Sequence, residues 1–160
     1  MKAKKVNHLF FDETPEEEVN LIALYSSVEI FRVVYHLNRV LEMRLERTEE
    51  DIDFISADSI SNYPLYHFYD KNMDTDYYVV ANKARIKPTA SEKAESLFKE
   101  HSSYTTYLIP ERKNVDYFFK IERRFQINDL LKKIKEIRQI SAVHQEDISR
   151  IKSYKNLIFD

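Results

Sequence analysis

The sequence contains no glycine, no cysteine and no tryptophan. Without cysteine there is no disulfide framework, thiolate zinc site, iron–sulfur cluster or thiol nucleophile. Without glycine the chain lacks the backbone that phosphate-cradling loops need, which excludes the P-loop, the dinucleotide-binding fingerprint, the kinase glycine-rich loop and the GxSxG hydrolase motif. Lys, Ile, Asn, Tyr and Phe are plentiful, so a composition typical of an AT-rich genome explains the missing glycine better than a functional cause does.

Length and hydropathy are those of a soluble globular protein. The chain has 160 residues, 43% of them hydrophobic, with 27 acidic and 25 basic residues and a formal net charge of −2. A chain of this length buries roughly 68–70% of its unfolded surface, enough for a core without disulfide or metal staples. No long apolar run is present, and the N-terminus lacks the apolar stretch of a signal peptide. We therefore expect one domain over residues 1–160, in the cytoplasm and away from membranes.

Two segments have the periodicity of amphipathic helices. From Ile30 to Leu41 apolar residues, Phe31 among them, recur at helical spacing. Ser26 and Glu29 match a capping box that would begin this helix. A second helix is expected to begin at Asn128, with basic residues in its last turn.

The other regular segments are rich in aromatic and β-branched residues and predict strands. The expected strands cover residues 6–11, 63–69, 77–86, 104–109, 115–121, 140–144 and 154–159. Turn-rich connections predict two antiparallel hairpins, 63–69 with 77–86 and 104–109 with 115–121, whereas 88–103 forms either a short helix or an irregular excursion. Together the segments predict an α+β fold, an antiparallel sheet of mainly hairpin-linked strands with two principal helices packed on one face.

The face of this sheet opposite the helices is expected to be rich in aromatic side chains. Tyr66, Phe68, Tyr107 and Phe118 are assigned to it, and this is too much aromatic surface to leave in water. The candidates for covering it are the 88–103 segment, a second copy of the chain or a partner protein.

The connection in the second expected hairpin carries a recognisable motif. Ile109-Pro110-Glu111 is followed after three residues by Val115-Asp116-Tyr117. The letters match the pattern IPExxxVDY, and the chain resembles the family of small, largely Bacteroidetes proteins named after it. Further similarity lies at Leu21-Ile22, Ser26-Ser27, Leu37-Asn38 and residues 155–159, although Ala23 stands where family members often have glycine. The family name denotes a motif and not an activity, so the resemblance implies no function.

Glu111 and Asp116 are the chemically significant members of this motif. We favour a structural interpretation, in which both carboxylates accept hydrogen bonds from turn amides or pair with Arg112 and Lys113 and so fix the hairpin register. Contact with a partner is the second interpretation. A carboxylate pair for acid–base or metal chemistry is the least favoured, because no third ligand or positioned base is identifiable nearby.

Other residues suited to metal binding or catalysis are scattered. The five histidines show no metal-ligand spacing. Ser26 and Ser27 lack a matched histidine and acid, and we interpret them as helix caps. We therefore expect no metal, no cofactor and no enzymatic activity; a hydrolase centred on Glu111 and Asp116 is the least favoured function.

Charge is unevenly distributed along the chain. Residues 1–60 hold 7 bases and 13 acids, whereas residues 112–138 hold 9 bases and 4 acids. The candidate contacts to an anion or nucleic acid in the basic segment are Arg123, Arg124, Lys132, Lys133 and Lys135. With an overall pI near 6.2 we favour a solvated surface for them. The opposite charges of the two segments also suit self-association.

These observations favour a non-catalytic cytoplasmic binding or adaptor protein that acts through a protein interface. Its partner would be another protein or a second copy of the chain in a homodimer. The alternative is a nucleic-acid-associated accessory protein that contacts RNA with residues 112–138, which is less favoured.

Overall fold

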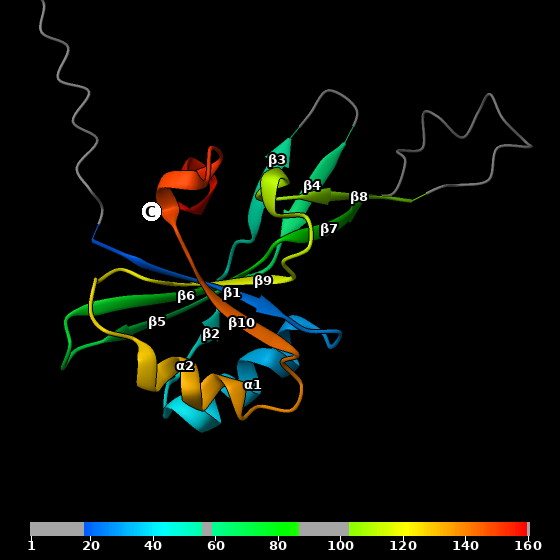
Figure 1. Cartoon of the computed structure of the whole chain (residues 1–160). Coiled ribbons are helices and arrows are strands. Elements are labelled where there is room, and N and C mark those ends of the chain that lie inside the picture. The colour runs from blue at the N-terminus through cyan, green and yellow to red at the C-terminus, as the bar shows by residue number, and fades with distance from the viewer. Residues whose placement is uncertain (1–17, 56–58, 87–102, 160) are drawn as a thin grey trace, which may run out of the picture.

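A six-stranded antiparallel sheet with two helices on one face forms the centre of the structure (Figure 1). The computed structural model describes residues 18–55, 59–86 and 103–159. The strands of the main sheet are, in spatial order, β10 (Ala142–Glu146), β1 (Asn20–Tyr25), β9 (Tyr117–Ile121), β6 (Thr75–Ala81), β5 (Leu65–Asp70) and β2 (Glu46–Arg47). Two smaller antiparallel sheets pair β3 (Ile52–Ile55) with β4 (Ile60–Tyr63) and β7 (Lys83–Ile86) with β8 (Tyr104–Tyr107). The predicted α+β class is confirmed.

The two helices, α1 (Ile30–Leu41) and α2 (Asn128–Lys135), pack side by side on one face of the main sheet. Val33 and Leu37 of α1 and Ile134 of α2 are fully buried against strand residues such as Phe119. Burying these side chains supplies the main favourable free energy of the layer, at roughly 25 cal/mol per Å² of apolar surface. Phe31, predicted on the apolar side of α1, is instead 55% exposed.

The predicted capping box at the start of α1 is wrong. Glu29 is the N-cap residue and makes no side-chain capping hydrogen bond. Ser26 lies three residues before the N-cap position, where its Oγ accepts from the Val28 N–H at 3.3 Å and donates to the backbone oxygen of Gln139 at 2.5 Å. The bond to Gln139 is a tertiary one, and it joins the β1–α1 connection to the segment after α2.

A chain without glycine needs other residues where the backbone turns left-handed. Glu42, at the C-cap of α1, has φ 56°, and its backbone N–H bonds to the carbonyl oxygen of Asn38. Asp74 in the β5–β6 turn has φ 47°. Asp and Asn tolerate this region better than most residues, whereas Glu carries the full steric cost of its Cβ.

The second face of the main sheet is covered by parts of the same chain. A second core lies between this face, the two small sheets and the C-terminal 3₁₀ helices η3 (Ile148–Arg150) and η4 (Tyr154–Leu157). Phe118 is fully buried in it, as predicted. The predicted placement of the other three aromatic residues is wrong, because Tyr66 and Phe68 pack on the helix face and Tyr107 lies in the small β7–β8 sheet. Within the described residues, the aromatic surface therefore gives no reason to invoke a second copy of the chain.

The first predicted hairpin is confirmed only up to Ala81, where the expected strand 77–86 divides into β6 and β7, and the second hairpin is wrong. β5 pairs with β6 from Leu65↔Val80 to Asp70↔Thr75. β8, however, pairs with β7, and β9 lies between β1 and β6 in the other sheet. The intervening 3₁₀ helix η2 (Pro110–Arg112) carries the chain from the small sheet to the main one, so β8 and β9 do not become neighbours.

The C-terminal and flanking predictions have mixed outcomes. The strand expected at 140–144 is present as β10. The strand expected at 154–159 is wrong, because this segment crosses the second face as η4 and buries Leu157 and Phe159 in the core. The expected strand 6–11 and most of the 88–103 segment lie outside the described residues. In the part of the chain that is described, neither helix has the length and hydropathy to span a membrane.

Candidate functional site: the motif junction

The segment 109–117, which we call the motif junction, connects β8 to β9 at the meeting point of the two cores. Ile109 is fully buried and Val115 is 1% exposed, both in the second core. Pro110 is the first residue of η2, where its missing N–H costs no hydrogen bond and its fixed φ suits the helical turn. The three apolar members of the motif thus shape the connection, and its three polar members extend from it toward other elements.

Glu111 fastens the C-terminal segment to the motif junction. Its Oε1 accepts a hydrogen bond from the backbone N–H of Ser153 at 2.6 Å, and its Oε2 accepts one from the Ser153 hydroxyl at 2.9 Å. Burial is the largest single influence on the Glu111 pKa and raises it, but the hydrogen bonds from Ser153 and neighbouring backbone together outweigh burial and lower it. Glu111 is therefore held as a carboxylate.

Asp116 fastens the connection between β1 and α1. Its Oδ2 accepts from the backbone N–H of Ser26 at 2.9 Å, and its Oδ1 lies 2.6 Å from the Lys83 ammonium. The partners predicted for the two carboxylates are wrong, since neither Glu111 nor Asp116 pairs with Arg112 or Lys113 in the described structure. They bind elements distant in sequence, which local spacing does not reveal.

Tyr117 reaches the same connection from β9. Its hydroxyl donates to the backbone oxygen of Val28 at 2.6 Å. Burial, with a smaller contribution from the negative charges of Asp116 and Glu29, raises the pKa of Tyr117 to about 12. The phenol therefore remains protonated and donates this hydrogen bond throughout the physiological range.

Asn82 is the residue of this site that the sequence did not indicate. It is fully buried between β6 and β7, and its Nδ2 donates to the backbone oxygens of Arg112 (2.8 Å) and Val115 (2.9 Å). Its Oδ1 accepts from the N–H of Ile109 at 2.8 Å, and its own backbone bonds to Leu108 and Asp116. The available signal was a single amide in an apolar run after Val79, Val80 and Ala81, a position where a buried polar side chain must find partners.

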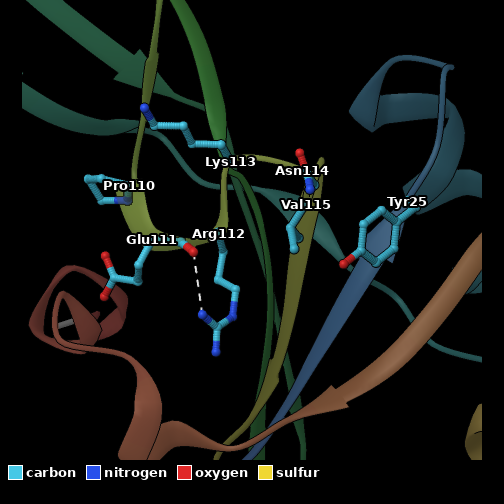
Figure 2. A pocket seen from close by; sticks show the side chains of 7 residues that line it. All are labelled: Tyr25, Pro110, Glu111, Arg112, Lys113, Asn114 and Val115. Atoms are coloured by element: carbon cyan, nitrogen blue, oxygen red, sulfur yellow. Dashed lines mark hydrogen bonds between the residues drawn. The ribbon is translucent and has the colours of Figure 1, made fainter.

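A hollow of about 280 Å³ lies beside the motif junction (Figure 2). It is lined by Tyr25, Pro110, Glu111, Arg112, Lys113, Asn114 and Val115. Figure 2 shows the Glu111 carboxylate directed away from Tyr25 and toward the C-terminal segment, where Ser153 holds it. Arg112 is bound as well, through Nε to Glu146 Oε2 at 2.9 Å and Nη1 to the Glu111 carbonyl oxygen at 3.3 Å.

The charged side chains of Glu111 and Arg112, which line this hollow, are bound to other parts of the fold. Both motif carboxylates accept hydrogen bonds from backbone N–H groups, Asp116 from Ser26 and Glu111 from Ser153. Among the described residues, no group of three or more His, Asp or Glu side chains is arranged to hold a metal ion. Every buried side-chain nitrogen and oxygen in this part of the chain has a hydrogen-bond partner.

The basic segment 112–138 is divided between two faces of the molecule. The five candidate residues Arg123, Arg124, Lys132, Lys133 and Lys135 are all exposed, in α2 or the loop before it. The Lys132 ammonium lies 3.6 Å from Asp129, a fully solvated pair of little energetic weight. Arg112 and Lys120 belong to the other face and are paired with Glu146 and Glu122. The sequence count therefore overstated the basic charge that one surface presents.

Lys120 is an unexpected charge beneath the C-terminal segment. Its side chain is 2% exposed, and its Nζ lies 3.0 Å from Glu122 Oε1 and 5.4 Å and 5.8 Å from the ring centroids of Phe159 and Tyr154. The ring of Tyr78, directly opposite in β6, lies 4.9 Å from that of Phe159 in a tilted arrangement, and burial raises the pKa of Tyr78 to about 12. The ammonium is thus paired with one carboxylate and attracted to two aromatic faces, and this cluster holds the C-terminal segment against the sheet.

Comparisons of the chain with family models, curated proteins and solved structures found no match.

Proposed function

We propose that the chain is a non-catalytic, cytoplasmic binding or adaptor protein that acts through a protein interface on its helix layer. The helix layer is defined as α1 and α2 with their flanking residues, 28–44 and 123–139. The exposure of two aromatic side chains on α1 carries this proposal. Phe31 is 55% exposed and Tyr35 is 61% exposed, one helical turn apart.

Exposed aromatic residues beside arginine have the composition of an interface centre. Arg32 and Arg39 are exposed on the same helix. Tyrosine, phenylalanine and arginine are enriched at protein interfaces, and a few such residues supply most of the binding free energy. The polar groups of the motif junction, by contrast, are engaged within the fold, which supports a binding role over a catalytic one.

Paired variants of equal chemistry test this proposal. Phe31→Ser with Tyr35→Ser should abolish capture of a protein partner from lysate, because both anchors are lost while the buried face of α1 is unchanged. Tyr69→Ser removes a comparably exposed aromatic residue, 44% exposed on β5, and should leave capture unchanged. Equal urea midpoints would show that all variants fold. Capture that survives the double substitution contradicts the proposed interface.

The alternative of RNA binding is supported by the exposure of Arg123, Arg124 and the three α2 lysines. Nuclease treatment of the lysate separates the two functions. A protein interface should retain its partner after nuclease, whereas a complex held together by RNA should release it. Loss of every captured protein on nuclease treatment would replace the leading proposal with this alternative.

A further inference from the structure

The fold gathers positive charge into the helix layer. Residues 28–44 and 123–139 contain nine basic and four acidic residues, a formal charge of +5, in a chain whose total is −2. The remainder therefore holds 16 basic and 23 acidic residues, a charge of −7. The two segments lie far apart in sequence, and they become one surface only because α1 and α2 pack on the same face of the sheet.

The cations of this layer are available to a partner. Arg32, Arg39, Arg124, Lys133 and Lys135 are exposed, and none forms an ion pair with a residue that the structure describes. An exposed cation without a pair loses little hydration when it meets a carboxylate at the rim of an interface.

We infer that the helix layer docks an acidic segment of another protein, one that also carries apolar side chains. The carboxylates of that segment would meet the cations of α1 and α2, and its apolar side chains would pack on Phe31 and Tyr35. The inference rests on the proposed function, to which it adds the chemistry of the partner.

The surroundings of the layer favour a short acidic segment over a long polyanion. Immediately after α1 the chain becomes acidic, with Glu46, Glu49 and Glu50 all exposed near the β2 edge. On the other side, Arg123 Nη1 bonds to the Met73 carbonyl oxygen at 2.7 Å, which places it beside the acidic β5–β6 turn that contains Asp74. A nucleic acid strand that extended beyond the helix layer would meet this negative charge, and the repulsion is only partly screened at separations below the Debye length of about 8 Å.

Fluorescence anisotropy with three labelled probes tests the inference. The probes are a peptide rich in Glu and Leu, the same peptide with each Glu replaced by Lys, and oligouridylate of equal length. The wild-type protein should bind the Glu peptide in preference to both others, and this binding should weaken as salt is added.

Two charge-reversal variants locate the binding surface. Lys132→Glu with Lys133→Glu should weaken binding of the Glu peptide roughly tenfold, the effect expected of two exposed charge pairs that become repulsive. Lys152→Glu with Lys155→Glu changes the net charge equally at exposed positions outside the layer, and it should have little effect. A fourth probe, the Glu peptide with Ser in place of each Leu, tests the apolar contacts. The wild-type protein should prefer the Leu peptide to this probe, and Phe31→Ser with Tyr35→Ser should remove that preference.

Several results would overturn the inference. Equal binding of the Glu and Lys peptides, or equal weakening by both charge-reversal variants, shows that the helix layer holds no specific site for an acidic segment. Preferential binding of oligouridylate, with a salt slope of about −0.7 per phosphate contact that the Lys132 and Lys133 variant reduces, assigns the layer to nucleic acid. Dimers in sedimentation that the same variant dissociates assign it to a second copy. A partner captured through Phe31 and Tyr35 but insensitive to charge reversal would leave the proposed function standing and reject this inference alone.

Discussion

Asn82 is the residue whose replacement should damage the motif junction most. Substituting alanine removes three side-chain hydrogen bonds, to the carbonyl oxygens of Arg112 and Val115 and from the N–H of Ile109. The side chain of Asn82 is fully buried, Ile109 is equally buried and Val115 is 1% exposed. Water therefore has little access to the backbone groups that lose their partner.

The magnitude follows from how many buried groups lose their partner. A buried donor or acceptor left without a partner costs about 1–3 kcal/mol. The Arg112 carbonyl counts least, because it still accepts a hydrogen bond from the Val115 N–H at 3.0 Å. We expect a total loss of about 3–5 kcal/mol for Asn82→Ala, a large part of the roughly 5–15 kcal/mol by which a domain is stable.

Equilibrium urea unfolding measures this loss, with Asn62→Ala as the matched control. Asn62 is also a strand asparagine with a side-chain hydrogen bond, 2.6 Å to Asp53, but it is exposed. Its substitution should change the free energy of unfolding by less than about 0.5 kcal/mol. The dependence on urea, the m value, should stay the same for both variants. A loss below about 1 kcal/mol for Asn82→Ala, at an unchanged m value, would refute the central role of Asn82.

Three further predictions concern the motif residues. Asp116→Asn should cost about 1–3 kcal/mol in urea unfolding, because an amide does not serve both the Ser26 N–H and the Lys83 ammonium; a midpoint equal to that of wild type contradicts this. The pKa of Glu111 is lowered from 4.5, so its contribution to stability is complete above pH 4.5 and is lost as pH falls through the lower folded value. The free energy of unfolding should accordingly fall less on acidification for Glu111→Gln than for wild type. The same dependence on pH in both proteins would disprove this. The pKa of Tyr117 is raised from 10.0 to about 12, so its contribution is complete below pH 10 and is lost between pH 10 and 12. In an ultraviolet titration Tyr117→Phe should lose one late-titrating tyrosine, and an unchanged amplitude near pH 12 would count against the buried hydrogen bond to Val28.

The elements that the sequence predicted well are those decided by local periodicity. Helix α1 was predicted from its apolar spacing, and Val33, Val34 and Leu37 are buried as that spacing requires. Phe31 satisfies the same spacing but lies at the edge of the apolar stripe, and only the position of the neighbouring strands decides that it is exposed. Periodicity thus identifies a helix and its approximate buried face, but not where the protein core ends.

The errors arose where long-range partners determine the outcome. The strands around the IPExxxVDY motif have the composition of a hairpin, yet the Pro110–Arg112 turn moves β9 into a different sheet from β8. Ser26 has the spacing of a helix cap, yet Asp116 and Gln139, 90 and 113 residues away, bind it instead. Pairings of this kind depend on which surfaces the cores bring together, and no local sequence window contains that information.

The motif residues and the exposed aromatic residues of α1 therefore differ in what their side chains do. The motif residues hold elements of the fold together, whereas the aromatic residues face solvent. Glu111, Asp116 and Tyr117 each bond to a different backbone position, in the C-terminal segment or the β1–α1 connection. A side chain used in this way gains its hydrogen bonds from the fold, and recruiting it to a ligand would break a bond that holds two elements together. Phe31 and Tyr35 have no such commitment in the described structure, because more than half of each side chain faces solvent. Substitutions in the motif should consequently lower stability first and binding only as a result, whereas substitutions at Phe31 and Tyr35 should lower binding alone.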